Sequence, residues 1–208
     1  MGKVSEDTFR KGIDRMHYTT QILNSEEITN LGQILGSKWV NISGDGLVDA
    51  DFCVDCVFVN TNSISLRISL DMSPIAIDGE IDDYPNLRIE ATSSESEAMR
   101  TDGKVFFHGR GEVVQEIYVL RETLLSIRSG ENFFENVADI CVAIRLENMW
   151  ISFVRASHFS EVFFVKRTYT RDEIELPDTV EEWGPDLIER YQSTIEWIRV
   201  GGAGNNNK

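Results

Sequence analysis

Cys53 and Cys56 are the residues whose type and spacing come closest to a chemical site. Cysteines at this spacing hold zinc or carry out thiol–disulfide exchange in other proteins. A structural zinc site needs four converging ligands, but the remaining Cys141 and three histidines provide no second pair. The surrounding residues are typical of a strand, in which side chains three apart point to opposite faces. We therefore expect reduced, buried cysteines, and no metal or redox site.

Ser157 and His158 are the closest approach to a nucleophile beside a base. Catalytic groups of this kind must converge in space, and a third group must orient the base. No glycine-framed turn surrounds Ser157, and neither common glycine-rich phosphate loop occurs in the sequence. The acidic segment 78–83 lacks the glycine position and the closing glutamate of a calcium loop. The sequence thus predicts no catalytic residue, no bound metal and no cofactor.

Acidic residues are the strongest chemical signal, since 35 of them against 20 basic residues give a net charge of −15. A part of them gathers in two stretches, 78–83 and 172–189, that contain no lysine or arginine. Negative charge repels phosphate backbones, so we expect a basic protein as partner and no nucleic acid. The candidate partner-binding residues are Asp78, Glu80, Asp82 and Asp83 in the first stretch, and Asp172, Glu173, Glu175, Asp178, Glu181, Glu182, Trp183 and Asp186 in the second. The alternative is that the acids only keep the protein soluble while Trp183 covers the core.

Strand patterns dominate the middle of the sequence. Between residues 63 and 71, isoleucine and leucine alternate with polar residues, which predicts a strand with one buried face. The apolar run 52–59 precedes it across a polar turn, so the two runs predict an antiparallel hairpin. Residues 112–128 fit either a helix or strands, and their strand-forming residues favour strands. Further strands are predicted at 38–43, 87–91, 140–146, 150–154 and 162–165. A loop containing Pro74, Gly79 and Pro85 is predicted before the strand at 87–91, and another loop at 92–103.

Helical patterns are confined to the two ends of the chain. Apolar residues recur at helical spacing within 26–35, and Ser25 is a candidate N-cap, so a short amphipathic helix is predicted there. A C-terminal helix is predicted from Pro185 onwards, because apolar residues follow at helical spacing as far as Ile198. The glycine- and asparagine-rich tail 201–208 is expected to be disordered.

These elements predict one α+β domain over residues 1–200, built mainly of antiparallel β-sheet with a short N-terminal and a C-terminal helix. Similar residues at 51–54 and 139–142 leave two interpretations open: a duplicated hairpin unit, with halves near 37–92 and 112–168, or two unrelated hairpins. No run is long and apolar enough for a membrane helix, and the polar start is unlike a signal peptide. A cytoplasmic protein without membrane contact is therefore expected.

The lack of a catalytic motif, together with concentrated negative charge, favours a binding role. Small size, acidity and the lack of catalytic motifs are similar to the general character of bacterial immunity proteins, which neutralise cytotoxic nucleases and related toxins. Such a protein would act by occlusion, because its carboxylates would pair with the lysines and arginines that a toxin uses to hold phosphates. Two alternatives stay open: a ligand-binding or structural module of unknown partner, and an enzyme whose site the sequence does not reveal.

Overall fold

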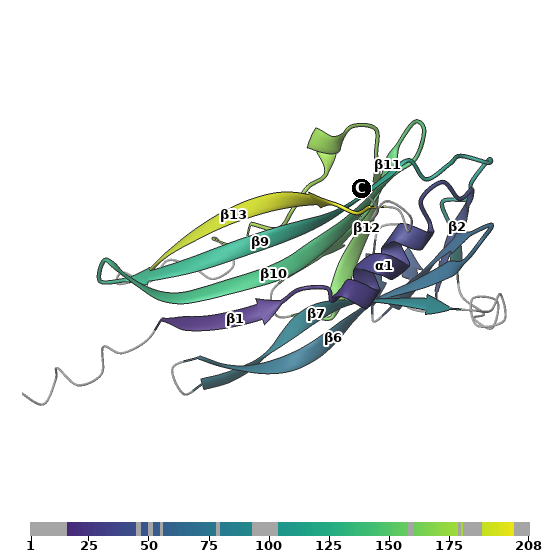
Figure 1. Ribbon diagram of the computed structural model, residues 1–208. Helices are drawn as coiled ribbons and strands as arrows, with labels where there is room; N and C mark the ends of the chain where they lie inside the picture. Colours follow the sequence, from purple (N-terminus) through teal and green to yellow (C-terminus); the bar gives the residue numbers. More distant parts are fainter. Residues whose placement is uncertain are drawn as a thin grey trace, which may run out of the picture.

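The computed structural model describes residues 16–44, 47–49, 52–54, 56–77, 80–92, 104–157, 160–178, 180 and 189–201. These residues form two mainly antiparallel β-sheets with little helix (Figure 1). The large sheet contains β1 (His17–Gln21), β3 (Leu47–Asp49), β4 (Phe52–Val54), β9 (Glu116–Arg128), β10 (Glu131–Arg145), β11 (Trp150–Arg155), β12 (Val162–Thr168) and β13 (Glu189–Arg199). The small sheet contains β2 (Trp39–Gly44), β5 (Cys56–Thr61), β6 (Ser65–Ile77), β7 (Glu80–Thr92) and β8 (Lys104–Phe106). The helical elements of the described residues include α1 (Ser25–Gln33) and the 3-10 turn η2 (Arg171–Glu173).

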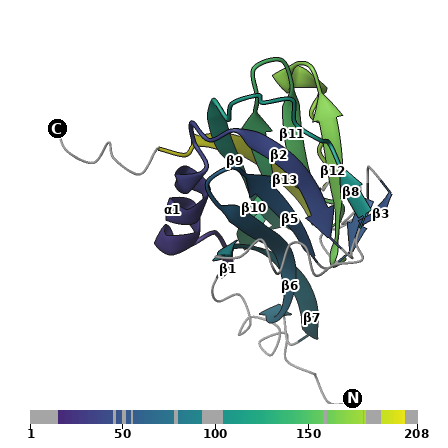
Figure 2. The same cartoon turned by 90° about the vertical axis from the view of Figure 1, so that its right-hand side faces the viewer.

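Strand order in the large sheet is β13-β9-β10-β11-β12-β4-β3, and the small sheet runs β7-β6-β5-β2-β8. The main hydrophobic cluster joins buried side chains of both sheets and of α1, such as Leu31, Ile68 and Val142. A second cluster, which includes Leu120 and Cys141, is covered by the segment that follows β12 and carries η2. We call this segment, residues 169–178, the strap. Both views show the β6–β7 hairpin protruding on the side away from the strap (Figures 1 and 2).

Helix α1 confirms the predicted N-terminal helix, but its N-cap is Asn24 and not Ser25. The Asn24 side chain accepts hydrogen bonds from the backbone N–H groups of Glu26 and Glu27, and the Glu27 carboxylate accepts one from Asn24 N at 2.8 Å. This reciprocal pair is a capping box, which satisfies donors that a helix start leaves open. Glu27 also accepts a bond from Ile89 N, so the helix start is tied to β7.

The loop predicted around Pro74 and Pro85 is wrong, because β6 and β7 continue through both prolines as one long hairpin. Proline lacks an N–H group, so a strand tolerates it where one side needs no partner. Pro85 lies in β7, at the end of the small sheet. Pro74 lies beyond residues 65–69 of β6, which are the ones that pair with β5. Each proline therefore sits where its strand has an unpaired side among the described strands.

The predicted C-terminal helix is also wrong, since β13 occupies Glu189–Arg199 and pairs with β9 along its length. The apolar residues of this segment fit a helical period. The segment also contains strand-forming residues, however, among them Thr194, Ile195 and Trp197. The long β9 strand offers these residues an edge to pair with, and tertiary pairing overrides a local helical pattern.

The remaining strand predictions are confirmed: the β5–β6 hairpin, and strands near 38–43, 87–91, 112–128, 140–146, 150–154 and 162–165. The run 52–59 divides into β4 and β5, which belong to different sheets. Of the loop predicted at 92–103, Thr92 ends β7 and the rest lies outside the described residues, as does the predicted tail 201–208 apart from Gly201. The single domain and the duplication stay predictions. Among the described helices, none is long and apolar enough to cross a membrane.

Candidate functional site

A groove of about 460 Å³ lies between β1 and the β6–β7 hairpin. One wall consists of residues 19–22, and the other of residues 73–76 together with Asn86 and Arg88. The groove is open to solvent, and most of its side chains are polar. Asn86 donates to Ser73 Oγ at 2.6 Å, which fixes the hairpin wall. This is a surface suited to a chain segment more than to a small apolar ligand, which is usually enclosed.

Strand β1 presents one edge of its backbone to this groove. It pairs with β10 in parallel, His17 opposite Phe134 and Gln21 opposite Ala138, and has no second partner among the described strands. Successive side chains of a strand point to opposite faces, so a cavity lined by the three consecutive strand residues 19–21 lies along the strand's edge. The backbone N–H and C=O groups on that edge are therefore directed towards the groove.

Gln21, on the β1 wall of the groove, has a buried polar side chain without a hydrogen-bond partner among the described residues. It is 6% exposed, and neither its amide nitrogen nor its amide oxygen has a hydrogen-bond partner among the described residues. Its neighbour on the same face of β1, Thr19, donates instead to Asn136 at 2.8 Å. Burying an amide without a partner is unfavourable by about 1–3 kcal/mol. The buried amide of a residue that lines the groove thus has hydrogen-bonding capacity that the described residues do not use.

The β6–β7 hairpin also carries part of the first acidic stretch, at residues other than those that line the groove. Asp82 and Asp83 are exposed at the start of β7, and the exposed Asp71 lies on β6. The one basic residue of the groove, Arg88, is 3.6 Å from both Asp71 and the Glu27 carboxylate, so its charge is offset within the protein. Glu80 opens β7, whereas Asp78 lies outside the described residues.

The second acidic stretch is divided between the strap and undescribed residues. Asp172, Glu173, Glu175 and Asp178 are exposed on the strap, while Glu181, Glu182, Trp183 and Asp186 lie outside the described residues. Hydrogen bonds from the backbone N–H groups of Tyr169 and Thr170 hold the pKa of Glu173 below its usual value. A salt bridge from Lys166 likewise lowers the pKa of Glu175. These two carboxylates help to shape the strap, and Figure 1 places the strap and the β6–β7 hairpin on opposite sides of the molecule.

The strap also has a structural task, which is to cover the second cluster. Ile174 is buried there, and the Arg171 guanidinium lies 3.7 Å from the centroid of the Trp197 ring. A cation over an exposed aromatic face contributes about 0.5–1 kcal/mol. We expect Arg171→Ala to lower the free energy of unfolding by roughly that amount. Urea denaturation measures it, and the neighbouring Asp172→Ala is the control. Equal stabilities of the two variants would contradict the prediction.

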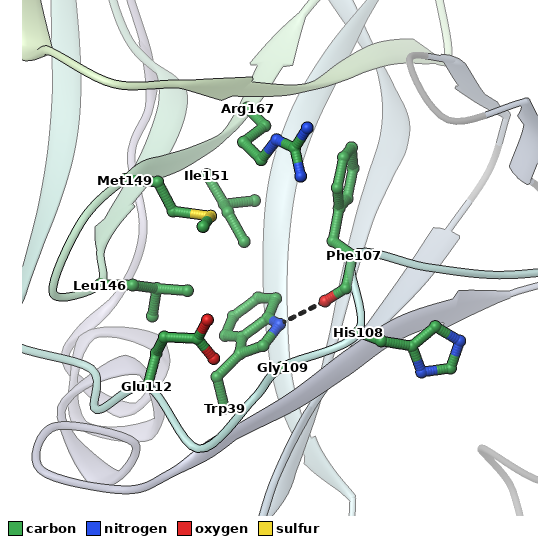
Figure 3. Close-up of a pocket in the computed structure, with 9 residues that line it drawn as sticks. All are labelled: Trp39, Phe107, His108, Gly109, Glu112, Leu146, Met149, Ile151 and Arg167. Atoms are coloured by element: carbon green, nitrogen blue, oxygen red, sulfur yellow. Dashed lines mark hydrogen bonds between the residues drawn. The ribbon is translucent and has the colours of Figure 1, made fainter.

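A second cavity lies where Trp39 meets the turn after β8 (Figure 3). Its volume is about 30 Å³, enough for roughly one water molecule. The Trp39 indole donates to the Phe107 carbonyl at 2.7 Å, as the dashed line in Figure 3 shows. A side chain on Gly109 would meet the Trp39 carbonyl at 2.3 Å, so the backbone is packed tightly against this tryptophan. The cavity is thus a gap in a well-packed corner and is too small for a metabolite.

The other sequence motifs do not converge. Cys53 belongs to β4 of the large sheet and Cys56 to β5 of the small sheet. Cys141 is buried, and this burial raises the pKa of its thiol, which keeps it protonated and unreactive. His158 lies outside the described residues. Within the part of the chain that the structure describes, no three His, Cys, Asp or Glu side chains are grouped closely enough to hold a metal ion.

Sequence reasoning missed β1 and therefore the groove. Residues 17–22 contain Tyr18, Thr19 and Thr20, which are strand formers, but the segment is too short to show a period. Comparisons with protein families, curated proteins and solved structures returned no match for this chain. The groove between β1 and the β6–β7 hairpin is accordingly the feature from which a function is inferred.

Proposed function

We propose that this is a non-catalytic binding protein that holds a basic protein partner at the groove between β1 and the β6–β7 hairpin. The observation that supports this most is Gln21: the residue lines the groove, and its buried amide has no partner among the described residues. Acidic side chains on the neighbouring hairpin favour a partner that carries positive charge. An immunity protein that occludes a basic toxin is one protein of this kind.

The β6–β7 hairpin is acidic in sequence. Between Arg67 and Arg88 the chain contains no lysine or arginine, but five acids: Asp71, Asp78, Glu80, Asp82 and Asp83. Carboxylates of one sign along one element attract a partner of opposite charge, raise its rate of association and exclude acidic competitors. The net charge of −15 extends this attraction beyond the groove.

Affinity capture tests the proposal. The immobilised protein is exposed to lysate of its native host at low salt and at about 0.5 M salt, where the screening length falls to a few ångströms. One basic protein that is retained at low salt and weakened at high salt is expected. Its binding must also depend on the hairpin acids, because a highly acidic protein retains basic proteins non-specifically. No retained protein at either salt concentration would overturn the proposal.

We expect the double variant Asp82→Asn/Asp83→Asn to bind the captured protein about threefold to tenfold more weakly at low salt, since exposed charges at the rim of an interface have modest effects. The difference should shrink at 0.5 M salt. The matched control is Glu147→Gln/Asp172→Asn, which removes the same charge from exposed positions on the β10–β11 turn and the strap. Equal losses in both variants would show that only net charge matters and would remove the hairpin from the proposed interface.

A further inference from the structure

Resting on the proposed function, we propose that the partner supplies an extended basic segment that joins the large sheet as an added strand along the open edge of β1. In this mode the backbone of the segment bonds to the backbone of β1, and its side chains alternate between the two faces. The β6–β7 hairpin forms the outer wall of the groove, and its acids lie beside the lysines and arginines of the segment. The Gln21 amide bonds to a peptide group of the segment.

The contrast with another sheet edge supports this assignment. Strand β7 ends the small sheet, and α1 covers its edge at one residue: Glu27 accepts from Ile89 N at 3.3 Å, and Asn30 donates to Ile89 O at 3.4 Å. Side chains of the helix thus bond both backbone groups of this residue. Covering an edge in this way prevents unwanted pairing with other chains. The protein thus covers β7 at Ile89, whereas the edge of β1 faces a groove and has no second partner among the described strands.

The residue types of β1 point in the same direction. Residues 17–22 contain no Lys, Arg, Asp, Glu or Pro, which are the residues that normally protect an exposed edge. Strand β13, at the end of the large sheet, carries charges such as Glu189, Glu196 and Arg199. An uncharged, open edge is a liability unless a partner uses it, because it can pair with any extended chain.

The dimensions of the groove fit a short extended segment. Residues 19–22 line the groove on the side of β1, and a strand rises by about 3.4 Å per residue, so this wall is roughly 14 Å long. The hairpin wall opposite contributes four consecutive residues, 73–76. A segment of about four residues matches this length, at the rise per residue of a strand. A segment of this length is short enough to be contained in a peptide displayed on phage.

The test is a selection of random dodecapeptides, displayed on phage, against the full-length protein at low salt. The most enriched peptide is then synthesised in three forms: unmodified, N-methylated at every even position, and N-methylated at every odd position. An added strand bonds to its neighbour through alternate residues, so the two methylated forms should differ. We expect one form to bind at least about tenfold more weakly than the unmodified peptide and the other to stay within about threefold.

Several outcomes decide the question. An enriched peptide rich in Lys and Arg, with the expected difference between methylated forms and slowed amide exchange at residues 17–22, supports strand addition. No enriched peptide, or equal binding by both methylated forms, overturns it. If a basic protein is still captured from lysate in a manner that depends on Asp82 and Asp83, the proposed function survives and only the strand-addition mode fails. Loss of that capture signal instead removes the proposed function itself.

Discussion

Replacing Asp139 with alanine is expected to lower the free energy of unfolding by about 2–4 kcal/mol. The Asp139 side chain is fully buried in β10, where its two oxygens accept bonds from Arg121 at 2.8 and 3.1 Å. One of these oxygens also accepts the buried Leu23 N–H at 2.8 Å, just before α1. Without the carboxylate, the Leu23 N–H loses its acceptor inside the protein. Arg121 is 26% exposed and can turn towards water, which keeps the loss below that of a fully buried pair.

Urea denaturation of the wild type and of Asp139→Ala measures this difference. Asp139→Asn separates the two contributions, because an amide oxygen can still accept the Leu23 N–H but carries no charge for Arg121. We expect this variant to fall between the other two. An exposed acid on the strap, Asp172, serves as the control in Asp172→Ala, with a change within about 0.5 kcal/mol. A loss below about 1 kcal/mol in Asp139→Ala would show that this carboxylate does not anchor α1 to the large sheet.

The sequence gives a reason to suspect that Asp139 has a structural role, but it does not identify the partners. A single acid within the apolar run 137–144 is unusual, because a buried charge needs a partner. Its partners, however, lie 18 and 116 positions away, at Arg121 and Leu23. Local patterns contain no information on such distant pairs. A β-bulge between Asp139 and Cys141 further shifts the alternation, so even the face of the residue could not be read from the sequence.

Strands with strict alternation were predictable, and those stabilised by their neighbours were not. Strand β6 was predictable because its apolar residues alternate clearly with polar ones, and its hairpin partner β5 because it lies in a continuous apolar run. Strand β13 has apolar residues that fit both a helical and a strand period, and only its pairing with β9 decides between them. The same holds for β1, whose five residues become a strand beside β10. Propensity is a weak guide where tertiary pairing supplies the hydrogen bonds.

The candidate site shows the same limit. The acids Asp82 and Asp83 were identified from composition, and the structure places both on the hairpin that forms one wall of the groove. The strap acids were grouped with them in the sequence, yet two of these, Glu173 and Glu175, are engaged within the strap or with Lys166. Gln21 carried no signal at all, because an amide becomes informative only when its burial and its partners are known.

Gln21→Leu is expected to change stability and binding in opposite directions. Leucine has a similar size and needs no hydrogen bond, so the variant should gain about 1–2 kcal/mol in the free energy of unfolding. Its affinity for the selected basic peptide should fall by about tenfold, because the segment loses a buried hydrogen-bonding partner at the edge of β1. Thermal unfolding and titration calorimetry measure the two effects on the same samples.

The matched control is Ser152→Ala on β11. The Ser152 hydroxyl is also buried without a hydrogen-bond partner among the described residues, but its backbone neighbours are Ala143 and Lys166, away from β1. This variant should keep or raise stability and leave peptide affinity unchanged. If both variants bind the peptide as the wild type does, Gln21 takes no part in recognition. If Gln21→Leu is less stable than the wild type, the amide has a hydrogen-bond partner in the free protein and is not available to a bound segment.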